Sequence, residues 1–238
     1  MRQAYGLRGM VQSESMTTDT QATPPSPANV DWRRAEFILT ALAFCGFITI
    51  AIRINTIWSG LPAHPLIIHV PVVLIPLSVL GALACIARPK WFETYGILLC
   101  GIAIVGMSSI FLAMRAGAAL EGDLNLQGQA AELISRHSHM AHLLAYDFIL
   151  FTAALILTFS AHRISGGRPT GLAIADRTLG SVTVYNALRV VLVILALVSV
   201  YLVYRTGDLG AQAVWAERLQ QAHHGFGGFG GYGPPGGP

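Results

Sequence analysis

Residues 65–87 read PLIIHVPVVLIPLSVLGALACIA, and this stretch decides the fold. It contains no Asp, Glu, Lys or Arg, and it exceeds the roughly 20 residues that a helix needs to cross about 30 Å of hydrocarbon. Because a bilayer offers the backbone no hydrogen-bond partners, a spanning run of this kind must be helical. The stretch therefore predicts a membrane-spanning helix with one ionisable residue, His69, inside it.

Four further apolar runs of similar length extend the same pattern along the chain. They cover about Phe37–Ile57, Thr94–Met114, Met140–Ala161 and Leu188–Tyr204. The short alternating segments that are typical of membrane β-barrels are absent from the sequence. The chain is therefore predicted to be an all-α integral membrane helical bundle with five transmembrane helices.

The composition supports a lipid environment and excludes other classes. The 238 residues are 53% hydrophobic and 11% charged, with a net charge of +3, whereas soluble domains carry about 25% charged residues. Mean hydropathy is +0.57. The small net charge and the lack of a basic run argue against nucleic acid as a partner. Cys45, Cys85 and Cys100 all lie in apolar runs, which favours buried thiols over a disulfide framework.

The composition also divides the chain into segments. Residues 1–34 are rich in Ser, Thr, Gln and Pro and are expected to form a disordered N-terminal tail. Residues 35–58 are expected to form an extra transmembrane helix, and 60–215 a four-helix membrane domain. Residues 216–238 are expected to form a Gly-rich flexible tail. The polar stretches at 115–139 and 162–187 are expected to be the two long connectors between spans.

The histidines gather on one side of the predicted membrane. With five spans, seven of the eight histidines fall on the side that holds the C-terminus, and His162 alone falls on the other side. Lys and Arg are more frequent on the side of the N-terminus, which predicts a cytoplasmic N-terminus and an outer C-terminus. His69 is the histidine farthest inside an apolar run, and ionisable groups there mark a functional site by default.

Two facing imidazoles in a helical bundle are what a haem b iron requires as axial ligands. His69 from one helix and His142 from another are predicted as the ligand pair, for haem or for a metal ion. His64 lies about 140° around the helix from His69, whereas His139 and His142 share a face. Both His64 and His139 remain candidate cofactor ligands. Two arginines at helix ends, Arg115 and Arg205, are candidate partners of haem propionates.

Other polar residues admit a structural interpretation as well as a functional one. His137 and His139 could belong to a solvated loop, and His223 and His224 to the tail. Asp147 also lies inside an apolar run. Three roles are open to it: a proton carrier, a protonated core acid or the partner of an arginine. The candidate arginines are Arg53, Arg115 and Arg205.

Two short stretches resemble an uncharacterised bacterial membrane-protein family, domain of unknown function 2231. They are His64-Pro65-Leu66-Ile67-Ile68-His69-Val70-Pro71, similar to the family's His-Pro-x-x-x-His-x-Pro, and Leu202-Val203-Tyr204-Arg205-Thr206-Gly207. A histidine that opens the family's third helix matches His139 or His142. The resemblance covers about residues 60–215. It implies a bacterial inner membrane location and, because relatives are sometimes fused to Rieske domains, a redox setting.

The sequence supports three hypotheses from different classes. The first is a haem b protein that passes electrons between a quinone or partner and a redox protein at the outer face. The second is a protein that binds or transports copper, zinc or iron ions through histidines. The third is a structural or assembly subunit, in a homo- or hetero-oligomer, without a cofactor. No soluble-enzyme motif is present, which favours a binding or electron-transfer role over an enzyme.

Overall fold

The computed structural model describes residues 38–41, 46, 57–58, 61–123, 127–168 and 173–226. Within these residues, four helical segments are long and apolar enough to cross a membrane. They are Ala63–Ala87, Trp91–Asp123, Gly128–Ser165 and Val182–Trp215. The prediction of an all-α membrane bundle is confirmed. The fifth expected span, at 37–57, and the N-terminal tail lie almost wholly outside the described residues.

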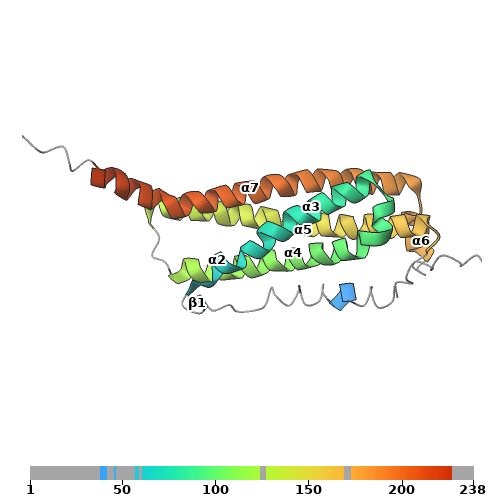
Figure 1. The fold of residues 1–238 in the computed structure, drawn as a ribbon, viewed down its shortest axis with the longest axis horizontal. Helices are drawn as coiled ribbons and strands as arrows, with labels where there is room; N and C mark the ends of the chain where they lie inside the picture. The colour runs from blue at the N-terminus through green and yellow to red at the C-terminus, as the bar shows by residue number, and fades with distance from the viewer. Residues whose placement is uncertain are drawn as a thin grey trace, which may run out of the picture.

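The elements follow one another as antiparallel passes. In chain order they are β1 (Ile57–Trp58), β2 (Leu61–Pro62), α2 (Ala63–Ile67), α3 (His69–Ala87), α4 (Lys90–Asp123), α5 (Gly128–Ser165), α6 (Ala173–Leu179) and α7 (Val182–Phe226). The two short strands pair antiparallel, Ile57 with Pro62 and Trp58 with Leu61. Figure 1 shows the long helices side by side, with α2 and the C-terminal part of α7 at one end and α6 at the other.

The membrane pass formed by α2 and α3 is interrupted once, at Ile68, between the two helices. The sequence predicts kinks at Pro71 and Pro76, since proline lacks the amide hydrogen that a helix uses. Pro71 cannot donate to the carbonyl of Ile67, and the break falls directly after that residue. The flanking bonds survive, with Ile68 N–H donating to His64 O at 3.1 Å. Pro76 lies inside α3.

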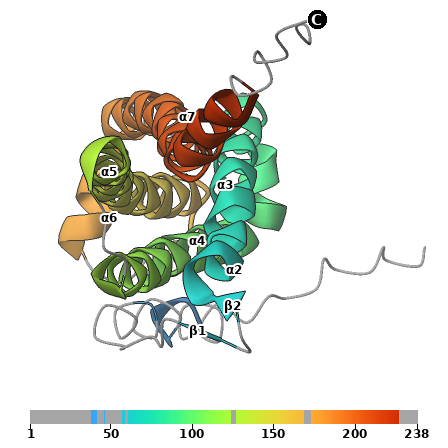
Figure 2. The ribbon, with the colours of Figure 1, turned by 90° about the vertical axis from the view of Figure 1, so that its left-hand side faces the viewer.

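The core lies between the four passes, which surround a common interior in Figure 2. Its largest fully buried side chains include Phe92, Phe148, Phe151 and Leu155, and the rings of Phe148 and Phe151 stack with centroids 5.1 Å apart. Helix α7 divides cleanly into two faces. Leu192, Ala196 and Ser199 are buried, whereas the outer face exposes a stripe of large apolar residues that face lipid: Val190, Ile194, Leu197, Tyr201 and Tyr204.

The expected connectors at 115–139 and 162–187 are largely helical in the structure. Helix α4 continues to Asp123, and α5 begins already at Gly128. Helix α5 has 38 residues and is therefore about 57 Å long, well above the hydrocarbon thickness of about 30 Å. Its first turns are polar because they lie beyond the apolar run, and Glu132 pairs with Arg136 four residues on.

The predicted C-terminal tail also begins later than expected. Helix α7 runs to Phe226, so residues 216–226 are helical rather than a flexible tail. The helix continues because residues 211–222 contain no glycine and carry good helix formers such as Ala, Gln, Glu and Leu. Residues 227–238, which hold most of the tail's glycines, lie outside the described residues.

Candidate functional site

A pocket of about 910 Å³ lies where α2 begins, α4 ends and α5 begins, with α7 closing one side. Its lining is mostly apolar and rich in small residues such as Ala113, Gly117, Ala141 and Gly207. Its ionisable lining residues are His64, Arg115, Glu121, His137 and His142. We call this space the histidine pocket.

His64 extends from α2 into the histidine pocket and contacts α4. Its Nδ1 lies 2.8 Å from the backbone oxygen of Ala113. A carbonyl oxygen can only accept, so Nδ1 carries the hydrogen and donates it. The ring also lies close to Gly117, where an added Cβ would stand 3.0 Å from ring atoms Cε1 and Nδ1. The neutral ring therefore keeps an unprotonated Nε2.

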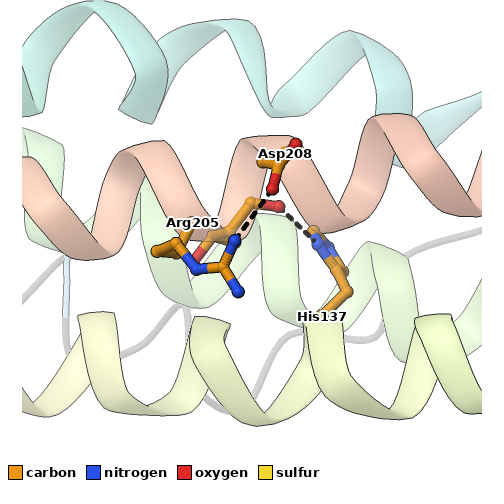
Figure 3. Close-up of polar contacts among 4 residues, drawn as sticks. His137, Arg205 and Asp208 are labelled. Atoms are coloured by element: carbon orange, nitrogen blue, oxygen red, sulfur yellow. Dashed lines mark hydrogen bonds and ion pairs between the residues drawn. The ribbon is translucent and has the colours of Figure 1, made fainter.

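His137 enters the pocket from α5 and leans on α7. Its Nδ1 donates to the backbone oxygen of Thr206 at 2.8 Å, as Figure 3 shows. An added Cβ at Gly210 would stand 3.1 Å from ring atoms Cε1 and Nδ1. As for His64, the bond to a carbonyl fixes the tautomer and leaves Nε2 as the nitrogen that can bind a ligand.

The two rings face each other across the bundle. Their centroids lie 6.3 Å apart, and their planes are nearly perpendicular at 88°. They come from residues 73 positions apart in the chain, on α2 and α5, so the fold rather than local sequence brings them together. His64 and His137 are therefore the two pocket-lining histidines whose rings the fold brings together.

The predicted pair, His69 and His142, is not brought together in this way. His69 is exposed outside the pocket lining, and its Nδ1 lies 3.3 Å from the oxygen of Leu66 in the same helical pass. His142 lines the pocket, but its Nδ1 bonds Ser138 O of its own helix at 2.8 Å. His139 is exposed and does not line the pocket.

The two predicted arginines differ in position. Arg115 lines the histidine pocket from α4. Arg205 does not line it, and instead pairs with Asp208 at 2.9 Å on α7, one turn further along (Figure 3). The arginine that can meet an anionic group in the pocket is therefore Arg115.

Asp147 lies deep in the bundle and bonds a hydroxyl group. It is 8% exposed, and Ser199 Oγ donates to its Oδ2 at 2.6 Å. Its hydrogen-bond partner is thus a serine; of the arginines offered as one alternative, Arg205 pairs with Asp208, and Arg53 lies outside the described residues. The sequence did not point to a serine partner, because a serine inside an apolar run usually bonds to a carbonyl of its own helix.

The described residues contain no cluster of three or more His, Cys, Asp or Glu side chains that could hold a metal ion. His162 lies at the opposite end of the bundle, near the end of α5. Its Nε2 lies 4.0 Å from Oε1 of Glu93. Its ring packs 5.5 Å from that of Phe92. The imidazoles of the two ends are therefore separated by most of the length of α5.

The fold and this pocket define a polytopic α-helical membrane protein with a pair of pocket-facing imidazoles. The chain belongs to the family described as "Predicted membrane protein (DUF2231)", which matches residues 60–223. The resemblance inferred from the sequence is thus confirmed. Searches of curated proteins and of solved structures found no match. The two stretches that carried the resemblance meet at the site, since His64 of the first faces His137, which bonds Thr206 of the second.

His137 is the site residue that sequence reasoning undervalued. A signal for it exists, because His137 precedes the buried residues Leu144 and Phe148 by seven and eleven positions. These helical spacings put all three on one face of α5. The signal was missed because the histidine lies before the apolar run, in a stretch interpreted as a loop.

Proposed function

We propose that this protein is a membrane-bound haem b protein that carries electrons, and that His64 and His137 are the side chains that would bind the haem. The observation that carries the proposal is the pair of rings 6.3 Å apart, each with Nδ1 bonded to a backbone carbonyl. Metal-binding histidines usually donate their other ring N–H to such an acceptor, which orients the ring and raises its basicity.

The spacing of the rings fits an iron atom between them. A metal ion bound by one nitrogen of each ring would lie about 2.0 Å from each nitrogen. When the distance from each nitrogen to its own ring centroid is added, the two centroids would lie about 6 Å apart. A haem supplies four nitrogens of its own, so two protein ligands complete the coordination. A bare ion held by protein alone takes four or more ligands as a rule, and the described residues offer no group of three.

The pocket also suits a large apolar ring. Its volume of about 910 Å³ lies in the range of cofactor pockets, roughly 300–1,000 Å³. Small residues such as Ala113, Ala141 and Gly207 line it and leave space between the helices. Arg115 on the lining would pair with a carboxylate of the cofactor. The apolar walls would keep water from the iron.

A haem b supplies one-electron chemistry when bound. The chain's own residues would hold it, orient it and set the polarity around it. The partners that fit this role are a quinone in the bilayer and a redox protein at the membrane surface. Lipid is already implied as a partner by the four spanning helices.

We infer the orientation from the charged residues at the two ends. The end of the bundle away from the histidine pocket carries Arg88, Lys90, Arg163, Arg168 and Arg177 near helix termini. The pocket end carries fewer cations, including Arg115, Arg136 and Arg205. The positive-inside rule then puts the pocket at the outer face of a bacterial plasma membrane. Electrons would be exchanged with a partner on that side.

A transition-metal site remains the second candidate, because imidazole nitrogens also suit copper, zinc and iron ions. One sample tests both. The full chain is expressed in a haem-competent host and purified in detergent, and haem is measured by pyridine haemochrome and metals by mass spectrometry. We expect about one haem b per chain and iron at the same molar ratio. Copper or zinc in that ratio with no haem would replace the proposal by the metal site, and absence of all three would leave a structural subunit.

A further inference from the structure

The contacts of His64 and His137 repeat one arrangement on two different helices. His64 donates to the carbonyl of Ala113 and its ring lies against Gly117, four residues later on α4. His137 donates to the carbonyl of Thr206, and its ring lies against a glycine, also four residues later, on α7. Acceptor and glycine are thus separated by one helical turn in both cases.

The spacing has a physical reason. Inside an α-helix, the carbonyl of residue i already accepts the amide of residue i+4, and one lone pair remains. The Cβ of residue i+4 tilts toward the N-terminus and covers the turn that holds this carbonyl. Glycine at i+4 has no Cβ and leaves the carbonyl open to an imidazole from another helix. At Gly117 and Gly210 a Cβ would come to 3.0 and 3.1 Å from ring carbon and nitrogen.

We propose that Gly117 and Gly210 are positioning residues, each of which opens a backbone carbonyl so that a facing histidine is held as the Nδ1–H tautomer with Nε2 toward the pocket. The consequence for ligand binding rests on the proposed haem function. The tautomer itself does not, since it depends only on the two hydrogen bonds. Helices α4 and α7 therefore carry equivalent histidine seats, each made of one carbonyl and one glycine.

The tautomer is measured directly. The full chain is labelled with ¹⁵N-histidine and studied by NMR in detergent at a pH where the rings are neutral, with signals assigned from His64→Gln and His137→Gln. We expect both rings to carry the hydrogen on Nδ1. A ring found with its hydrogen on Nε2 in the wild-type protein overturns the proposal for that seat, whether or not any haem is present.

The glycines are tested by Gly117→Ala and Gly210→Ala, with Gly122→Ala as the matched control. Gly122 lies on α4 outside the pocket lining, and an added Cβ there meets nothing within 4 Å. We expect each seat variant to lower haem affinity about 10-fold or more, as loss of an outer-shell partner of a ligand does, and to disturb the tautomer of its own histidine. The control is expected to keep both.

The two proposals fail in different ways. A colourless wild-type protein refutes the haem function, while the NMR tautomers still report on the seats. A coloured protein whose Gly117→Ala and Gly210→Ala variants keep the affinity and tautomers of Gly122→Ala refutes the seats and leaves the haem in place. Size-exclusion profiles identify any variant that does not fold, and the wild-type tautomers then decide.

Discussion

Ser199 of α7 donates a 2.6 Å hydrogen bond to the carboxyl group of Asp147 on α5, in the interior of the bundle. Around this pair, the facing turns of the other passes carry no charged side chain: residues 70–78 of α3 and 102–110 of α4 are free of Asp, Glu, Lys, Arg and His. The nearest ionisable side chains on the two helices themselves, Tyr146 and Tyr201, are exposed. Ser199 is therefore the partner on which this buried carboxyl depends among the described residues.

Ser199→Ala is expected to lower the free energy of unfolding by about 1–2 kcal/mol, because it leaves a buried carboxyl group without its partner. The matched control is Ser78→Ala. Ser78 is equally buried, but its hydroxyl donates to Leu74 O of its own helix, a carbonyl inside the helical ladder, so we expect a loss below about 0.5 kcal/mol. Unfolding of the purified protein in SDS-containing mixed micelles measures both. Equal losses would show that the interhelical bond adds nothing.

Gly96→Ala is expected to loosen the contact between α4 and α5. A Cβ at Gly96 would overlap the ring of Phe159, so one of the two helices must shift, at a cost of about 1–3 kcal/mol. Gly122→Ala provides the comparison, because it gains helix propensity of up to about 1 kcal/mol without a contact. The same unfolding assay measures the expected decrease in the free energy of unfolding for Gly96→Ala and the expected increase for Gly122→Ala. A Gly96→Ala protein as stable as the control would mean that the two helices are packed more loosely than the structure has them.

The orientation is tested with single cysteines introduced into a variant that lacks the three native cysteines. Gln127→Cys reports on the pocket end and Gly166→Cys on the opposite end, and both positions are exposed. We expect a membrane-impermeant maleimide added to intact cells to label Gln127→Cys alone. Lysed cells serve as the control for reactivity, since both positions should then react. Labelling of Gly166→Cys in intact cells would invert the proposed orientation.

The spans could be predicted from the sequence because hydrophobicity and length are local properties. The predicted runs at 65–87, 94–114, 140–161 and 188–204 all fall inside the four spanning helices. The apolar runs do not indicate how far each helix extends beyond the membrane. There, the first turns of α5 carry polar side-chain pairs such as Glu132 with Arg136, which hydropathy does not register.

The site was predicted less completely, because it depends on contacts between distant residues. The sequence identified His64, Arg115 and the pocket end of the bundle, but it favoured His69, whose position inside an apolar run says nothing about which face it occupies. In the structure that face is exposed, and His137 takes the place opposite His64. The carbonyls of Ala113 and Thr206 were invisible to motif reasoning, since backbone acceptors have no residue signature.

The central claim is that His64 and His137 bind haem iron, and a reduced-minus-oxidised absorption spectrum tests it most directly. The spectrum is recorded for the wild type, His137→Ala and, as the matched control, His69→Ala, which removes an exposed histidine outside the pocket. We predict a b-type difference spectrum in the wild type that His69→Ala retains and His137→Ala loses. A spectrum that survives His137→Ala and disappears with His69→Ala, or a wild type without a Soret band, would contradict the account.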